Sequence, residues 1–197
     1  MNSGATTERV YEGLKHRLVT NVFRPGDRLD PARLADDLHS SVTPVRDALH
    51  LLTGERLVVT RVSDGFHVAG MNGPALQDLY EWNAQVLLLS LGSRPGSRGT
   101  GAAEDPDQRE AGAGSLFLRI AAVSRNLEHR MAVLSLNDRL GAARLCEAGV
   151  MPAPEQEAES LRLLFDAGDV KGLRRAIVSY HRRRQKLADE IVRMLYR

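Results

Sequence analysis

The chain has 197 residues, and 27 lysines and arginines against 25 aspartates and glutamates give a formal net charge of +2. This balance excludes a strongly cationic arm and an acidic solvating tail, and the 5% aromatic content disfavours a stacking surface for single-stranded nucleic acid. The 43% hydrophobic content is typical of a globular protein. The length allows one large or two small cores, and the sharp change of composition in mid-chain favours two cores of roughly 100 residues each.

The single cysteine, Cys146, excludes an internal disulfide and cannot by itself form a zinc or iron–sulfur site. We therefore expect a reducing, cytoplasmic location. The first ten residues show no apolar core followed by a small-residue cleavage site. The most hydrophobic stretch, Val86 to Leu91, is far shorter than the roughly 20 residues of a membrane helix, so we expect no membrane association.

The first element predicted is a helix over residues Glu8 to Val22. Its apolar residues recur at a spacing of four, which places them on one stripe: Val10, Leu14, Leu18 and Val22. We expect the helix to stop at Phe23-Arg24-Pro25-Gly26-Asp27, because proline restricts the residue before it to extended conformations and glycine supplies the turn.

Two further helices are predicted close together. The first runs from about Pro31 to Leu38, with Asp30 as its N-cap. The next opens at residues 40–44, where Ser41 or Thr43 can cap it. Its predicted apolar face consists of Val45, Ala48, Leu49 and Leu52, and the opposite face of Val42, Thr43, Arg46 and His50. Two helices joined by a short turn in this way indicate a helix-turn-helix.

Two short strands are predicted next, over residues 57–61 and 66–69, on either side of the turn Ser63-Asp64-Gly65. An Asp-Gly pair between two short β-prone runs is typical of a hairpin. We therefore expect a two-stranded wing after the helix-turn-helix.

Beyond residue 71 the sequence predicts only helices. The first, from about Ala75 to Leu91, is followed by a glycine-rich polar segment that we expect to be mobile. Helical periodicity returns in four stretches: Leu116–Ser124, Leu127–Cys146, Glu155–Ala167 and Val170–Tyr196. The expected organisation is a winged helix-turn-helix over residues 1–70, a first bundle helix over 71–91, a flexible linker over 92–114, and the remainder of a helical effector-binding and dimerisation domain over 115–197. The expected fold class is mainly α.

Three segments of the N-terminal region carry a family resemblance: residues 23–29 (FRPGDRL), 34–38 (LADDL) and 41–49 (SVTPVRDAL). Together they closely resemble the winged helix-turn-helix of GntR-family transcription regulators over about residues 8 to 70. The resemblance implies a domain that binds double-stranded operator DNA as one half of a homodimer.

The predicted DNA contacts lie at the start of the third helix and in the wing. The helix N-terminus offers N–H groups and a positive dipole end beside the hydroxyls of Ser41 and Thr43. Arg46, one turn further on, can form a bidentate contact with guanine O6 and N7. His67 is either a minor-groove or phosphate contact or simply exposed. The complete predicted set is Arg33, Ser41, Val42, Thr43, Arg46, His50, Gly65 and His67.

The charge balance of this domain limits its electrostatic affinity for DNA. Residues 1–70 contain nine basic and nine acidic side chains. A domain without net charge has weak non-specific affinity for DNA. We therefore expect binding to depend on dimerisation and on a few well-placed contacts.

The chain departs from the family pattern at three positions. Val42 stands where arginine is usual, which removes one DNA contact and can favour a thymine methyl instead. His39 and Arg56 stand where glycine is common. Histidine is among the few other residues enriched at positive φ, so we expect the turn at residue 39 to be kept.

The helical region resembles the FCD ligand-binding domain of the FadR branch of the same family, on residues 78–81 (DLYE), 120–126 (IAAVSRN) and 167–169 (AGD). In many such domains an aspartate and three histidines hold a divalent metal, and a carboxylate effector completes the coordination shell of that metal. Here those positions fall at Ala113, Phe117, Ala158 and near Tyr180. The resemblance therefore implies no metal and no cofactor, with Phe117 and Ala158 packed in the core.

One charge interrupts the apolar seam of the last predicted helix. The seam follows a 4-3 spacing through Leu173, Ile177, Tyr180, Arg184, Leu187, Ile191 and Met194. A guanidinium near an apolar interior needs an anionic partner. The partner is either a small anionic effector or Asp138, Glu159 or Asp166; alternatively, Arg184 extends outward into solvent. The predicted effector-binding set is Arg130, Asn137, Arg144, Tyr180 and Arg184.

The leading hypothesis is a homodimeric, sequence-specific DNA-binding transcription regulator whose helical domain can sense a ligand without a metal. The alternative is a protein–protein interaction adaptor that has kept the winged fold but no longer reads an operator, as Val42 and the neutral N-terminal domain would allow. No Ser/His/Asp, Cys/His or paired-carboxylate arrangement stands out, so we expect no enzymatic activity.

Overall fold

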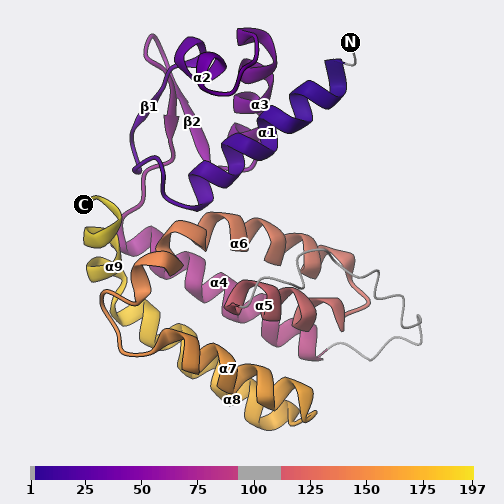
Figure 1. Ribbon diagram of the computed structural model, residues 1–197. Helices are drawn as coiled ribbons and strands as arrows, with labels where there is room; N and C mark the ends of the chain where they lie inside the picture. The colour runs from indigo at the N-terminus through magenta and orange to yellow at the C-terminus, as the bar shows by residue number, and fades with distance from the viewer. Residues whose placement is uncertain (1–2, 93–111) are drawn as a thin grey trace. The chain divides into compact units, whose positions relative to one another are not determined.

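The computed structural model describes residues 3–92 and 112–197 (Figure 1). The described chain divides into two compact units. The first takes in the residues up to Met71 together with Asp138–Cys146 and Val192–Arg197, and the second takes in the rest. Helices make up most of both, and one small sheet lies in the first, which confirms the expected fold class.

The N-terminal part of the first unit is a winged helix-turn-helix. Its elements are α1 (Ser3–Val19), β1 (Arg28–Leu29), α2 (Pro31–Asp37), α3 (Val42–Gly54), β2 (Val58–Arg61) and β3 (Gly65–Val68). The predicted two-stranded wing is incomplete, because β1 adds a third strand and the sheet order is β1-β3-β2. β1 pairs antiparallel with β3, placing Leu29 opposite Phe66. A two-residue strand is too short to show a period of two, so the sequence carried no signal for it.

The α1 stripe is correct for three of its four predicted members. Val10, Leu14 and Leu18 are buried, whereas Val22 is 63% exposed. The helix ends at Val19, before the predicted stop, and Asn21 then adopts a φ of 57°. Val22 therefore lies outside the helical repeat that would have turned it toward the core.

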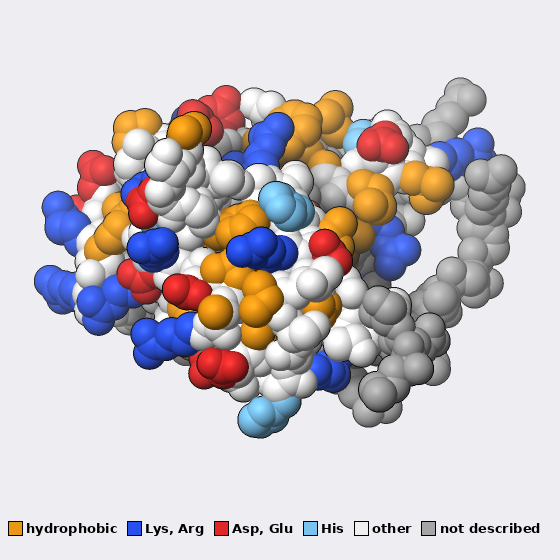
Figure 2. All heavy atoms as spheres, turned by 90° about the horizontal axis from the view of Figure 1, so that it is seen from above, with side chains coloured by type: hydrophobic (Ala, Val, Ile, Leu, Met, Phe, Trp, Pro, Cys, Tyr) orange, Lys and Arg blue, Asp and Glu red, His pale blue; other side chains and the backbone are white. Residues whose placement is uncertain are grey.

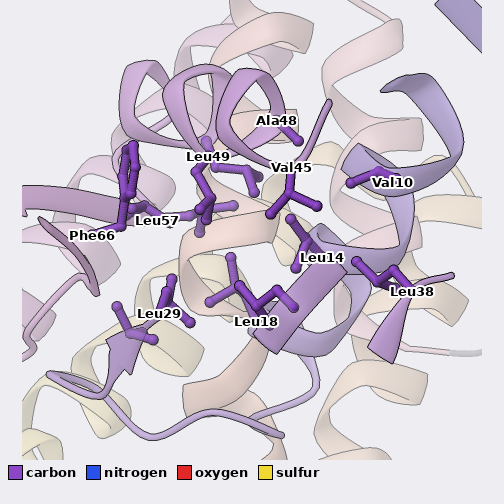
Figure 3. Close-up of a cluster of buried hydrophobic side chains, with 14 of the residues drawn as sticks. Val10, Leu14, Leu18, Leu29, Leu38, Val45, Ala48, Leu49, Leu57 and Phe66 are labelled. Carbon is purple, nitrogen blue, oxygen red and sulfur yellow. The ribbon is translucent and has the colours of Figure 1, made fainter. Parts of the chain in front are cut away.

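The core of this domain joins α1, α3 and the sheet. Figure 3 shows side chains of α1 pointing toward the inner face of α3, with Phe66 and Leu57 closing one side. All four residues predicted for that inner face are fully buried: Val45, Ala48, Leu49 and Leu52. The period of α3 is thus confirmed, and its other face is left for solvent or a ligand.

The two helix starts of the motif differ in how they are capped. The Asp30 carboxylate accepts hydrogen bonds from the backbone N–H groups of Ala32 and Arg33, whereas Ser41 caps α3 without a side-chain hydrogen bond. We expect Asp30→Ala to lower the free energy of unfolding by about 1 kcal/mol, and Ser41→Ala to change it by less than about 0.5 kcal/mol. Chemical denaturation of both variants measures this, and equal losses would contradict the assignment.

The second unit is built from helices. The remaining elements of the chain are α4 (Gly73–Gly92), α5 (Ala113–Ala122), α6 (Leu127–Glu147), α7 (Pro154–Asp166), α8 (Val170–Lys186) and α9 (Ala188–Leu195). α4 packs on α8 and α5, and α7 packs on α8 and α5. The predicted linker, residues 92–114, falls mostly on residues outside the described ranges; Gly92 is the last residue of α4, and α5 already begins at Ala113.

The single last helix that the sequence predicts is in fact two. α8 ends at Lys186, and the N–H of Leu187 bonds to the carbonyl of Arg184, which is a tighter turn than that of an α-helix. The buried seam then continues through Ala188, Ile191 and Leu195 rather than through Leu187 and Met194. No glycine or proline marks this break, so only the packing of the described chain reveals it.

Candidate nucleic-acid interface

The outer face of α3 presents the residues that the sequence placed there. Val42, Thr43, Arg46 and His50 are all exposed. Ser41 precedes them in an extended conformation. Its side chain is exposed and makes no capping hydrogen bond, so it does not occupy the first N–H groups of α3, which are the kind of donors that bind a phosphate. Arg33, on the preceding helix α2, is exposed as well.

Two residues in place of glycine adopt left-handed conformations. His39, in the turn between α2 and α3, has a φ of 48°, and Arg56, after α3, has a φ of 63°. The turn geometry at His39 is therefore kept, as expected. The strain of a side chain at positive φ is modest for histidine and larger for arginine.

The wing corrects the prediction for His67. This side chain is only 4% exposed, so neither simple exposure nor a direct DNA contact describes it. Its Nε2 lies 3.0 Å from Asp64 Oδ2, and Arg28 Nε lies 4.0 Å from the other oxygen of the same carboxylate. His67 thus supports the turn that carries Gly65, which is exposed and has a φ of 79°.

The sequence also missed the contact between α3 and the wing. The rings of His50 and Phe66 meet edge to face, with centroids 5.0 Å apart. At the wing tip, Val62 is 97% exposed and Arg61 beside it is exposed too. The Asp-Gly turn signalled the hairpin, but nothing in the sequence indicated which wing side chains would point inward.

Charged side chains of both signs lie on one face of the molecule. On the face shown in Figure 2, basic and acidic side chains are interspersed, with apolar groups between them, rather than gathered into one basic area. A surface of this kind attracts the DNA backbone only weakly.

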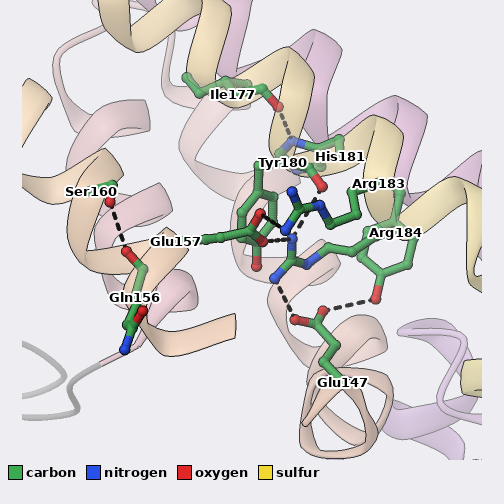
Figure 4. A network of polar contacts seen from close by, with 10 residues as sticks. Glu147, Gln156, Glu157, Ser160, Ile177, Tyr180, His181, Arg183 and Arg184 are labelled. Carbon is green, nitrogen blue, oxygen red and sulfur yellow. Dashed lines mark hydrogen bonds and ion pairs between the residues drawn. The ribbon is translucent and has the colours of Figure 1, made fainter. Parts of the chain in front are cut away.

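The second unit contains a buried ionic cluster. Arg184 is fully buried; its Nη2 lies 2.7 Å from Glu147 Oε2, and its Nη1 donates to Glu157 Oε2 at 2.7 Å and to the carbonyl of Tyr180 at 3.1 Å (Figure 4). Tyr80 donates from its hydroxyl to Glu147 Oε1 at 3.0 Å. The cluster therefore connects α4, α6, α7 and α8.

These contacts correct the predictions for Arg184. It does not extend into solvent, and the carboxylates that it contacts belong to Glu147 and Glu157 rather than to the three predicted candidates. Burial lowers the pKa of Arg184, but Tyr180, Glu147 and Glu157 outweigh it and raise the pKa above its usual value. The guanidinium hence stays charged and is already neutralised by the protein.

The other predicted effector residues are spread along α6. The Asn137 side chain donates to the carbonyl of Gly114 at 2.9 Å, near the start of α5. Arg130 is exposed, and Arg144 is half-buried further along the helix. Within this set, Tyr180 and Arg184 lie together: the Arg184 guanidinium is 3.3 Å from the centre of the Tyr180 ring.

The described residues contain no group of three metal-ligating side chains that could hold an ion. At two of the positions where the family resemblance would place ligands, Phe117 is fully buried in the core and Ala158 is half-buried. Burial raises the pKa of the Cys146 thiol, which makes it a poor nucleophile. No helix among the described residues is both long and apolar enough to cross a membrane.

The elements α1 to β3, with the exposed outer face of α3, place this part of the protein in the class of winged-helix domains. The model of bacterial regulatory proteins of the gntR family matches residues 6–68. The Nta operon transcriptional regulator of Aminobacter aminovorans is 31% identical over 142 residues, which cover 64% of this chain and 67% of that protein. The chain belongs to the gntR family.

A second relative, the transcriptional repressor GlaR of Escherichia coli, is 32% identical over 83 residues, which cover 41% of this chain and 38% of the repressor. The chain thus spans well under half of that relative's length. None of these relatives is described as an enzyme.

Solved structures share the fold. A GntR transcriptional regulator from Rhodococcus sp. RHA1 aligns with a TM-score of 0.75 at 17% identity, over 93% of this chain and 97% of that one. Escherichia coli McbR/YncC aligns with a TM-score of 0.66 at 20% identity, over 94% and 97%. At these identities the similarity concerns the fold alone.

Proposed function

We propose that the protein is a sequence-specific DNA-binding transcription regulator that acts as a homodimer. The observation that carries this proposal is the outer face of α3, where exposed Thr43, Arg46 and His50 follow an N-cap, Ser41, whose hydroxyl makes no capping hydrogen bond. A helix N-terminus with outward donors suits phosphate, and Arg46 one turn along suits guanine in the major groove. The wing, held by Asp64, His67 and Arg28, would lie beside the same groove.

The neutral charge of residues 1–70 supports the dimeric form of this proposal. One domain with nine basic and nine acidic side chains gains little from counterion release. Two copies reading two half-sites about one helical turn apart add their base contacts together. The adaptor alternative would keep the fold without this affinity, but it explains neither the outward donors nor Arg46.

We also propose that a small anionic effector, if it acts on the helical domain, acts at Tyr180 and Arg184. Arg184 is already paired, so the effector would have to replace a carboxylate. Glu157 is the easier one to displace, because its side chain is 25% exposed whereas that of Glu147 is 4% exposed. The effector would change DNA affinity only if it bound the DNA-competent and incompetent states differently.

Fluorescence anisotropy tests the DNA-binding proposal. The probe is a labelled duplex from the region upstream of the protein's own coding sequence, and an unrelated duplex of equal length serves as the reference. We expect the upstream duplex to bind at least about 1,000-fold more tightly at physiological salt. Affinity for both should fall steeply as salt rises. Equal affinity for the two duplexes, or none for either, would favour the adaptor.

A further inference from the structure

α4 and α8 together present exposed apolar side chains on a polar surface. Trp82 and Leu89 of α4 are 47% and 55% exposed, and Val178 of α8 is 43% exposed. On α4 the exposed residues 78, 82, 85 and 89 follow the spacing of one helical stripe. Residues 171, 175, 178 and 182 repeat the same spacing on α8. We call these two stripes, with the adjacent Glu81, the α4–α8 surface.

The charges of this surface are separated by helix. α4 carries two charged side chains, and both are acidic: Asp78 and Glu81. α8 carries seven charged side chains, and all are basic. Arg184 is buried and Arg183 is paired with Glu157, while Lys171, Arg175 and Arg182 are exposed. The charged side chains of α4 are thus negative, whereas the exposed charged side chains of the neighbouring α8 are positive.

The two helices run antiparallel in a known alignment. Gln77 donates to the carbonyl of Gln185, Asn83 contacts His181 at 3.1 Å, and Arg174 donates to the carbonyl of Leu88. Position 82 on α4 therefore lies at the height of about position 182 on α8, and position 89 lies at the height of about 173.

We propose that the α4–α8 surface binds the same surface of a second copy of this chain, about a two-fold axis that runs along the helices between α4 and α8. The inference rests on the homodimer of the proposed function and assigns its contact to these two helices. Rotation by 180° about such an axis exchanges the lateral positions of α4 and α8 but leaves every residue at the same height along the helices. α4 of one copy then faces α8 of the other.

The charge pattern is complementary under this operation. Glu81 of one copy comes opposite the second copy's Arg182, at matching height, and the reverse pair forms by symmetry. Trp82 covers the aliphatic part of the same arginine, and Leu89 comes opposite the region of Arg175. Partly exposed aromatic and arginine side chains are the residue types that most often carry binding energy at interfaces. The basic excess of α8 would repel any arrangement that brought two α8 helices together.

Sedimentation equilibrium of the full chain tests the proposal through a charge exchange. We expect a wild-type dimer, and for each of Glu81→Arg and Arg182→Glu a dissociation constant raised at least about 10-fold. The double variant Glu81→Arg/Arg182→Glu should recover most of the wild-type value, because the pair is restored with opposite sign. Trp82→Ser should weaken the dimer at least about 30-fold. Glu155→Arg, an exposed charge reversal on α7, is the matched control and should leave the dimer unchanged.

Circular dichroism melting confirms that each variant is folded. A wild-type monomer at micromolar concentration would overturn the inference, and so would a dimer that tolerates all three single substitutions, or a double variant no better than the singles. The DNA measurement is separate. Wild-type binding to the upstream duplex supports the proposed function whichever surface forms the dimer, and its absence would refute that function even if the α4–α8 dimer were found.

Discussion

Replacing Glu147 by alanine is expected to lower the free energy of unfolding by about 3–5 kcal/mol. The change removes one of two carboxylates that contact the fully buried Arg184 and also the acceptor of the Tyr80 hydroxyl. Breaking a buried ion pair from one side is strongly destabilising. Arg184 keeps Glu157, but its Nη2 and the Tyr80 hydroxyl lose the carboxylate that they contact in a place without water to replace it. Urea denaturation monitored by circular dichroism measures the loss.

A matched variant separates this effect from the general loss of a carboxylate. Glu159 pairs with Arg162 on the same helix, but both side chains are about half exposed. Glu159→Ala should therefore cost no more than about 0.5 kcal/mol. A comparable loss in the two variants, or a loss below about 1 kcal/mol for Glu147→Ala, would show that Arg184 reaches water or another partner once Glu147 is gone.

Arg46→Ala is expected to have the largest effect on DNA affinity. A bidentate arginine–guanine contact contributes about 1–3 kcal/mol of discrimination, and a homodimer loses two of them. The upstream duplex should consequently bind roughly 30-fold to 20,000-fold more weakly, whereas an unrelated duplex should lose much less. Because Arg46 is exposed, the free energy of unfolding should change by less than about 0.5 kcal/mol. Anisotropy titrations with both duplexes measure the difference.

Arg125→Ala serves as the reference for this experiment. Arg125 is an exposed arginine after α5, outside the winged domain, and its removal lowers the net charge equally. It should leave both affinities nearly unchanged. If Arg46→Ala weakened both duplexes by the same factor, Arg46 would be a phosphate contact instead of a base contact. Unchanged affinity would refute the assigned contact altogether.

Much of the candidate interface could be predicted from residue order because its determinants are local. The Asp30 cap follows from the residues at the start of α2. The apolar repeat of α3 and the exposure of Thr43, Arg46 and His50 follow from spacing along that one helix. His67 could not be predicted in this way. Its burial depends on pairing of β3 with a two-residue strand from another part of the chain, and on the carboxylate of Asp64.

The ionic cluster around Arg184 in the second unit was also only partly predictable from the sequence. Spacing identified Arg184 as a charge on an apolar seam, and electrostatics required an anionic partner for it. Which carboxylates fill that role depends on the packing of α6 and α7 against α8, and Glu147 and Glu157 lie 37 and 27 residues away along the chain. The break after Lys186 is also decided by packing, because no residue there disfavours a continuous helix.

Residue order alone thus determined the helix-turn-helix, the Asp30 cap of α2 and the outward face of α3, since hydrogen bonding and periodicity act within a few residues. It also determined the near-neutral charge, from which we predict that DNA affinity depends on a few contacts and on two copies. Tertiary structure decided the partners of the buried charges, the inward turn of His67 and the neighbouring stripes of α4 and α8. Those features arise between segments far apart in the chain, where spacing carries no information about which groups will meet.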